Sequence, residues 1–122
     1  MGIHESGEMY LEAILVLQEK SGYVRSVEVG EYLGYSKPSV SRGMAILKKD
    51  GYITVDPDGA LHLSDSGREI AEKIYERHTF LSKLLIAAGV PENIAVADAC
   101  KLEHSISDVS FAALKKYIRD HA

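Results

Sequence analysis

The stretch that decides the fold is residues 36–64, SKPSVSRGMAILKKDGYITVDPDGALHLS, in which a helical pattern runs directly into a β-hairpin pattern. Ser36 is a good helix N-cap, Pro38 suits a first helical turn, and Gly51 is typical of a helix end. The stretch therefore predicts one helix followed by a hairpin. The apolar residues that recur at the spacing of one buried helix face are Val40, Met44 and Leu47.

Two short β runs follow this helix, at residues 52–55 and 60–63, and the turn DPDG at residues 56–59 joins them. Upstream, residues 26–35 predict a shorter helix with Ser26 as its N-cap. A helix pair with a short connection, followed directly by a hairpin, is the layout of a winged helix–turn–helix.

The rest of the chain predicts further helices on either side of this unit. We expect a fold that is mainly α with a small β-hairpin: a winged helix–turn–helix domain over residues 1–72, then an α-helical domain over residues 73–122. The long central helix begins at Ser64 or Asp65. The further predicted helices cover residues 8–18, 64–88, 92–104 and 108–120.

Composition narrows the class of protein without naming a function. The chain has 122 residues, of which 46% are apolar, and a formal net charge of −4. It lacks an apolar run long enough to span a bilayer, and its start lacks the basic segment of a signal peptide. A single cysteine fits the reducing cytoplasm, so we expect a cytoplasmic protein that makes no contact with a membrane.

The only cysteine lies in DACKLEHSISD, residues 98–108, together with a glutamate and a histidine. Cys100, Glu103 and His104 are at i, i+3 and i+4, so on a helix they share one face. A thiolate, a carboxylate and an imidazole on one face are typical metal ligands. A small buried cysteine beside a solvated Glu–His pair is the alternative that the motif alone leaves open.

The predicted second helix of the pair carries the residues of a DNA-reading surface. Residues 24–54 contain five Lys or Arg against three Asp or Glu, so positive charge collects in this part of an acidic chain. Arg42 has the donors to read a guanine edge, and serine hydroxyls suit phosphates. An ordinary solvated helix, or a protein-binding surface, is the alternative. The candidate DNA-binding residues are Arg25, Ser36, Lys37, Pro38, Ser39, Ser41, Arg42 and Lys48.

Five stretches carry a resemblance to a known family. The chain resembles the iron-dependent repressor family, which includes the diphtheria toxin repressor and the manganese transport regulators, in a short two-domain form without the SH3-like domain. The resemblance implies a helical metal-binding and dimerisation domain after the winged helix. The stretches, in the family's order, are EMYLEAI, SKPSVSRGMAILKKDGYI, LHLSDSGREIA, ERHTFLSKLL and ACKLEH.

The resemblance implies one metal site made of Met9, Cys100, Glu103 and His104. The manganese-responsive branch has carboxylates where this chain has Met9 and Cys100. Sulfur ligands favour iron, cobalt, nickel or zinc over manganese. We therefore expect a divalent transition metal, with Fe2+ favoured and Mn2+, Co2+, Ni2+ or Zn2+ possible.

Glu12 and His78 are candidates for a further part of the site. Their positions resemble those that help to hold a second ion in the manganese regulators; otherwise Glu12 is a surface carboxylate and His78 a helix-face histidine. Ser82 and Val96 stand where the iron-responsive branch has its own second-site ligands. This chain thus combines the sulfur ligands of the iron-responsive branch with the short two-domain form of the manganese-responsive branch.

These features together favour a metal-dependent transcriptional repressor. A divalent metal acts as corepressor, and a homodimer binds the double-stranded palindromic operators of metal-homeostasis genes. The alternative is a metal-independent winged-helix regulator with Cys100 as a redox sensor. We expect no enzyme, because a Cys100–His104 nucleophile and base would lie one helical turn apart without an oxyanion-binding loop.

Overall fold

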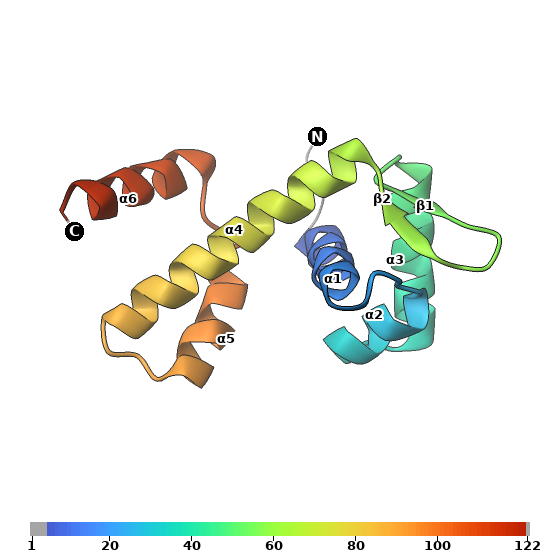
Figure 1. Cartoon of the computed structure of the whole chain (residues 1–122), viewed down its shortest axis with the longest axis horizontal. Helices are drawn as coiled ribbons and strands as arrows, with labels where there is room; N and C mark the ends of the chain where they lie inside the picture. The colour runs from blue at the N-terminus through green and yellow to red at the C-terminus, as the bar shows by residue number, and fades with distance from the viewer. Residues whose placement is uncertain (1–4, 122) are drawn as a thin grey trace. The chain divides into compact units, whose positions relative to one another are not determined.

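The computed structural model describes residues 5–121; residues 1–4 and 122, at the outer ends of the two predicted domains, lie outside the described part. The described chain divides into an N-terminal unit, up to Lys73, and a C-terminal unit, from Ile74 onward. The elements (Figure 1) are α1 (Glu5–Ser21), α2 (Ser26–Leu33), α3 (Lys37–Lys49), β1 (Ile53–Val55), β2 (Leu61–Leu63), α4 (Asp65–Ala87), α5 (Glu92–Leu102) and α6 (Asp108–Asp120).

The fold class is confirmed: the chain is mainly helical, with one small antiparallel hairpin after a helix–turn–helix. The helix α4 crosses from the first unit into the second, so each unit contains part of it. The domain boundary between residues 72 and 73, as a limit of independent folding, stays a prediction.

Helix α3 begins and ends where its sequence indicates. The Ser36 side chain accepts a hydrogen bond from the backbone N–H of Ser39, and Pro38 lies in the first turn. Gly51 follows the helix with φ +82, a conformation that glycine adopts without steric cost. The predicted inner stripe of Val40, Met44 and Leu47 is buried.

The predicted cap of α2 is wrong by one residue. Arg25 is the N-cap, and its backbone N–H donates to Glu28 Oε1 at 2.7 Å; Ser26 is already the first helical residue. Ser26 therefore has helical geometry, and the carboxylate of the first turn provides the capping bond instead. The helix ends at Gly34, which has φ +74 and donates to the Gly30 carbonyl.

The hairpin that follows α3 is shorter than its β pattern. Ile53 pairs with Leu63 and Val55 with Leu61, so Ile53 and Leu61 are buried while Thr54 and His62 are exposed. This alternation is expected for a strand pair with one face on a core. The backbone N–H of Leu61 also donates to the Val24 carbonyl at 2.8 Å.

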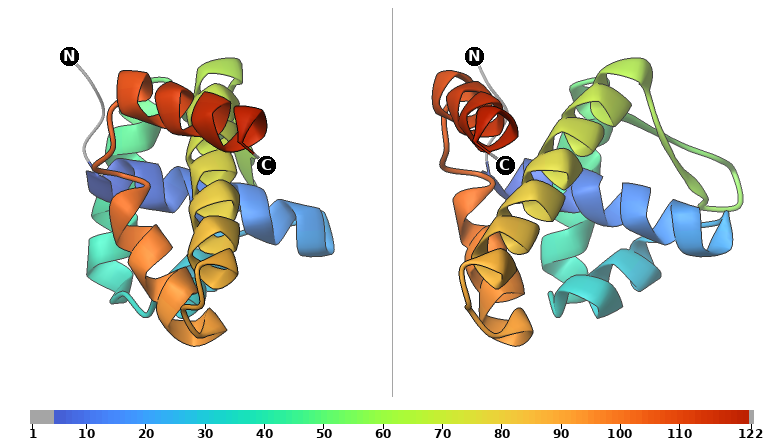
Figure 2. Two further views of the ribbon diagram at one scale, coloured as in Figure 1. Left: turned by 90° about the vertical axis from the view of Figure 1, so that its left-hand side faces the viewer. Right: turned by 60° about the vertical axis from the view of Figure 1, so that its left-hand side comes forward.

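Helices α1, α2 and α3 and the hairpin lie close together (Figures 1 and 2). A single cluster of buried apolar side chains joins them. Two glycines permit close packing there. A Cβ on Gly43 would lie 2.3 Å from the Tyr10 ring, and one on Gly67 would lie 2.1 Å from the Tyr52 carbonyl oxygen. The fully buried members of the cluster include Leu11, Ile14, Val29, Ile53 and Leu61.

The C-terminal unit contains the later turns of α4 with α5 and α6. Phe80 and Phe111 meet edge to face, with ring centroids 5.4 Å apart. The Ser107 side chain caps α6 by accepting from the Ser110 N–H. Helix α5 ends at Leu102, so the predicted helix 92–104 is too long. In the described part of the chain, every helix is too short or too polar to cross a bilayer.

Candidate metal centre and recognition surface

A buried carboxylate lies at the centre of a ligand cluster in the C-terminal unit. Glu103 has an exposed fraction of 0%, although it is ionisable. Its Oε2 lies 2.8 Å from His78 Nδ1, and its Oε1 lies 3.4 Å from His104 Nε2. The carboxylate therefore has an imidazole nitrogen beside each oxygen, which limits the cost of its burial.

Cys100 completes this cluster. Three ligand atoms lie within 4.8 Å of one another: a ring nitrogen of His78, the Sγ of Cys100 and a carboxylate oxygen of Glu103. Cys100 is exposed, whereas the His104 side chain is 2% exposed. The cluster is therefore accessible to solvent at Cys100 and closed to it at His104 and Glu103.

The donor set of this cluster fits a divalent transition metal. Imidazole nitrogen, carboxylate oxygen and thiolate sulfur together suit Fe2+, Co2+, Ni2+ and Zn2+ better than Ca2+ or Mg2+, which prefer oxygen alone. A bound dication would also offset the negative charge of the buried Glu103 carboxylate. His78, Cys100, Glu103 and His104 are thus able to hold such an ion.

The shared helix face expected from the sequence is only partly present. Cys100 lies in α5, but Glu103 is its C-cap and His104 lies in the following turn. The backbone at Glu103 remains helical, and its N–H still donates to the Ala99 carbonyl at 2.9 Å. The spacing of the motif therefore brings the side chains together even though the helix has ended.

A buried arginine holds the chain just after these ligands. Arg77, adjacent to His78 on α4, is 5% exposed. Its Nη1 donates to the Ile106 carbonyl at 2.6 Å, and its Nη2 forms an ion pair with Asp108. The turn between α5 and α6 is therefore tied to α4 next to a candidate ligand. Sequence reasoning missed Arg77, because nothing in its local pattern marks it as buried.

The two other predicted ligands, Met9 and Glu12, belong to the N-terminal unit. Both lie on α1 and are half-buried. The Met9 sulfur accepts a hydrogen bond from the Tyr35 hydroxyl, with an O–S distance of 3.5 Å. Ser82 and Val96 stand where the iron-responsive branch has second-site ligands. Ser82 is buried and Val96 is exposed.

The predicted DNA-reading residues cluster at the start of α3. Lys37, Pro38, Ser41 and Arg42 are exposed, and Lys48 is exposed near the helix end. The hydroxyls of the two other serines are engaged locally: Ser36 Oγ donates to Ser39 Oγ at 3.0 Å and also caps the helix.

Arg25 is held in place by neighbours that the sequence did not indicate. Its Nε donates to the Tyr23 hydroxyl at 2.9 Å, and that hydroxyl donates to Asp58 in the hairpin turn at 2.9 Å. The guanidinium also lies over the Tyr23 ring, 5.4 Å from its centroid. The hairpin therefore orients Arg25 at the start of α2.

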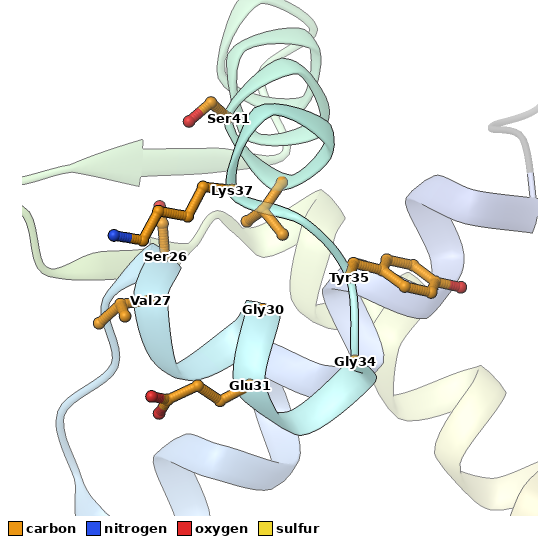
Figure 3. Close-up of a pocket in the computed structure, with 9 residues that line it drawn as sticks. Ser26, Val27, Gly30, Glu31, Gly34, Tyr35, Lys37 and Ser41 are labelled. Atoms are coloured by element: carbon orange, nitrogen blue, oxygen red, sulfur yellow. The ribbon is translucent and has the colours of Figure 1, made fainter.

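A pocket of about 440 Å³ separates α2 from the start of α3 (Figure 3). Its lining includes Val27, Gly30 and Val40 together with the charged residues Glu31 and Lys37. The pocket adjoins the candidate DNA-reading residues, because Lys37 and Ser41 are part of its lining. A molecule that binds at these two residues would therefore also contact the pocket.

Two family descriptions match this chain. Residues 3–61 match the iron-dependent repressor N-terminal DNA-binding domain, and residues 64–121 match the iron-dependent repressor metal-binding and dimerisation domain. The chain is 31% identical over 117 residues to the diphtheria toxin repressor of Corynebacterium diphtheriae, covering 95% of this chain and 52% of that protein. It is 30% identical over 112 residues to the transcriptional regulator MntR of Escherichia coli O157:H7, covering 92% and 72% respectively.

Solved structures show the same likeness. The metal-dependent transcriptional regulator MtsR matches with a TM-score of 0.85 and 26% identity, over 93% of this chain and 53% of that one. A manganese-dependent transcriptional repressor in complex with manganese matches with a TM-score of 0.83 and 28% identity, over 91% and 51%. The fold of this chain is thus similar to that of metal-dependent transcriptional regulators.

The chain belongs to the iron-dependent repressor family, as the resemblance in its sequence predicted. It spans about half the length of the diphtheria toxin repressors that it matches.

Proposed function

We propose that this protein is a metal-dependent transcriptional repressor that binds operator DNA in the cytoplasm as a homodimer, with a divalent transition metal as corepressor. The observation that carries the proposal is the cluster around Glu103, a fully buried carboxylate between two imidazoles and beside a thiol. Such a group is costly to bury and gains most from a bound cation.

The proposed ligands are the six residues of the sequence prediction. His78, Cys100, Glu103 and His104 support the proposal by their proximity in one unit. Met9 and Glu12 support it by their family position and by lying one turn apart on α1. The sulfur donors favour Fe2+ over Mn2+, with Co2+, Ni2+ and Zn2+ also compatible.

The proposed switch follows from the placement of these ligands on two units. An ion that takes ligands from both restricts their arrangement and so favours one spacing of the recognition helices in a dimer. Two such helices must be about 34 Å apart to enter successive major grooves. The metal needs only a higher affinity for the DNA-competent arrangement to shift the population towards it.

The proposed DNA contacts fall into two kinds. Arg42 and Lys37 face the bases from the start of α3, while Arg25, Lys48 and the serines contact phosphates. The proposed dimer rests on the C-terminal unit, whose helices expose large apolar side chains. These are Tyr75, Ile86, Ile94, Val96, Leu102, Val109 and Tyr117.

The test is operator binding by fluorescence anisotropy under anaerobic conditions, with Fe2+, Mn2+, Co2+ and Zn2+ titrated separately. We expect metal to tighten binding at least tenfold, and Glu103→Gln and Cys100→Ala to abolish this gain. Glu76→Gln is the matched control, because Glu76 is an exposed carboxylate on α4 that pairs with Lys115.

Two results would contradict the proposal. Binding that ignores metal but changes when Cys100 is oxidised would establish the redox regulator instead. A metal effect that survives both Glu103→Gln and Cys100→Ala would place the corepressor elsewhere in the chain.

A further inference from the structure

Tyr35 occupies a position between the metal-binding and DNA-binding residues of the N-terminal unit. It immediately precedes Ser36, the N-cap of α3, and its side chain is directed away from Glu31 and Lys37 towards α1 (Figure 3). There its hydroxyl donates to the Met9 sulfur at 3.5 Å. A proposed metal ligand is therefore hydrogen-bonded to the residue that precedes the recognition helix.

Tyr10, the neighbour of Met9, makes a second connection between the same elements. Its ring meets the Tyr35 ring edge to face, with centroids 5.9 Å apart and an interplanar angle of 89°. Its hydroxyl donates to the Ser39 carbonyl at 3.3 Å, and its ring lies against Gly43. Two consecutive residues of α1 thus contact the segment that begins α3.

The Tyr10 hydroxyl donates to the Ser39 carbonyl, and this hydrogen bond holds the first turn of α3 against α1.

The backbone of Tyr35 is fixed on one side by α2 and continues directly into Ser36, the N-cap of α3. Its N–H donates to the Gly30 carbonyl at 3.0 Å, and the preceding Gly34 has φ +74. Tyr35 is 37% exposed, and its side chain contacts the Tyr10 ring and the Met9 sulfur. A change at the Met9 sulfur thus reaches Ser36 through one side chain and one peptide unit.

We propose that Tyr35 is a positioning residue for the corepressor: its hydroxyl orients the Met9 thioether for metal and couples occupancy of that ligand to the start of α3. This inference rests on the proposed function, because it takes Met9 as a ligand. Methionine has three rotatable side-chain bonds, so an undirected thioether loses more freedom on binding than one already held.

The effect to be expected is that of one hydrogen bond. A hydrogen bond of ordinary net strength corresponds to about fivefold in an equilibrium constant. Tyr35→Phe removes the hydroxyl and keeps the ring contact with Tyr10. We therefore expect Tyr35→Phe to weaken Co2+ affinity about fivefold and to reduce the metal-induced gain in DNA affinity by a similar factor.

The first test observes the contact directly. The chain has three methionines, so protein labelled with 13C at the methionine methyl groups gives a simple NMR spectrum. Tyr35→Phe should shift the Met9 methyl signal and leave the buried Met44 signal in place, and diamagnetic Zn2+ should also shift Met9. Tyr32→Phe is the matched control, because it removes a hydroxyl from an exposed tyrosine of α2. An unchanged Met9 signal in Tyr35→Phe overturns the inference.

The second test is a double-mutant cycle on Co2+ affinity, read from the cobalt absorption spectrum. If Tyr35 acts through Met9, Tyr35→Phe weakens binding in the wild-type background and has no effect in a Met9→Leu background. Equal effects in both backgrounds would overturn the coupling and leave Tyr35 with a purely structural role.

The anisotropy experiment separates the two proposals. Wild-type protein that gains DNA affinity on adding metal, with Tyr35→Phe gaining as much, refutes the Tyr35 inference alone. Wild-type protein that gains no affinity refutes the proposed function and the inference with it.

Discussion

The two units of this chain are stabilised by different kinds of contact. Most of the buried apolar side chains lie in the N-terminal unit, in one cluster under the helix–turn–helix and hairpin. The buried polar residues of the described chain, Arg77, Ser82 and Glu103, all lie in the C-terminal unit. That unit also exposes large apolar side chains such as Val109, with an exposed fraction of 81%.

The difference indicates which unit depends on partners. An apolar core stabilises a fold in proportion to the area it buries, whatever else is bound. A buried carboxylate and a buried guanidinium stabilise only while their own partners are in place. We infer that the apolar core of the N-terminal unit is stable without metal, while the buried polar groups of the C-terminal unit depend on their partners.

The largest expected effect is on the core of the N-terminal unit. Leu11 is 0% exposed, so Leu11→Ala should lower the free energy of unfolding by about 2–5 kcal/mol. Ile46→Ala, at an exposed position of the same unit, should change it by less than about 0.5 kcal/mol. Urea unfolding with and without Zn2+ measures both. If Zn2+ fully restored the free energy of unfolding lost in Leu11→Ala, the stability of the N-terminal unit would also depend on metal.

Metal should protect the two units unequally. At a free metal concentration about 100 times the Kd, binding stabilises the bound state by about 2.7 kcal/mol. Amides of α5 and of the turn after it open only when the ligand cluster separates, so their hydrogen exchange should slow by up to about 100-fold. The amides of β1 and β2 should slow much less. Equal slowing in both units would mean that they open as one.

Local structure could be predicted from the sequence, whereas contacts between distant residues could not. Binary pattern and capping residues determine local structure, so Val40, Met44 and Leu47 were correctly placed in the core and Ser36 at a helix start. The cap at Ser26 was misplaced because the carboxylate of Glu28 competes for the same role. In the ligand motif, spacing identified Cys100, Glu103 and His104 but not the end of α5 at Leu102.

Contacts between distant residues left no local signal. Tyr35 and Met9 are 26 residues apart, and Arg77 and Ile106 are 29 residues apart. No spacing rule relates such pairs, because tertiary packing alone brings them together. The family resemblance added Met9, Glu12 and His78 to the ligand candidates, but it carried no information on these supporting contacts.

A substitution of the buried Arg77 should have an intermediate effect on the free energy of unfolding. Arg77→Met keeps the length of the side chain but leaves the Ile106 carbonyl and Asp108 without this donor, which should lower the free energy of unfolding by about 1–3 kcal/mol. Arg68→Met is the control, because the exposed Arg68–Glu72 pair contributes about 0.5 kcal/mol or less. Hydrogen exchange should locate the loss in the turn between α5 and α6. A uniform loss over both units would contradict a local role.

The smallest effect is expected in the hairpin turn, where a hydrogen bond from Tyr23 holds the pKa of Asp58 below its usual value, helped by the Ala60 N–H. A lowered folded-state pKa gives stability that is complete above the unfolded-state pKa and is lost as pH falls through the folded one. Asp58→Asn should therefore lower the urea midpoint slightly at neutral pH, by less than Arg77→Met, and not at all in acid below the lowered pKa.

Tyr23→Phe provides the check on that turn, because it removes the donor and keeps the ring under Arg25. In a Tyr23→Phe background, Asp58→Asn should lose most of its effect on the midpoint at neutral pH. Operator affinity in the presence of metal should fall modestly in either variant, since Arg25 loses part of its orientation. An unchanged affinity in both variants would show that Arg25 does not contact DNA through this arrangement, and that the reading surface consists of α3 alone.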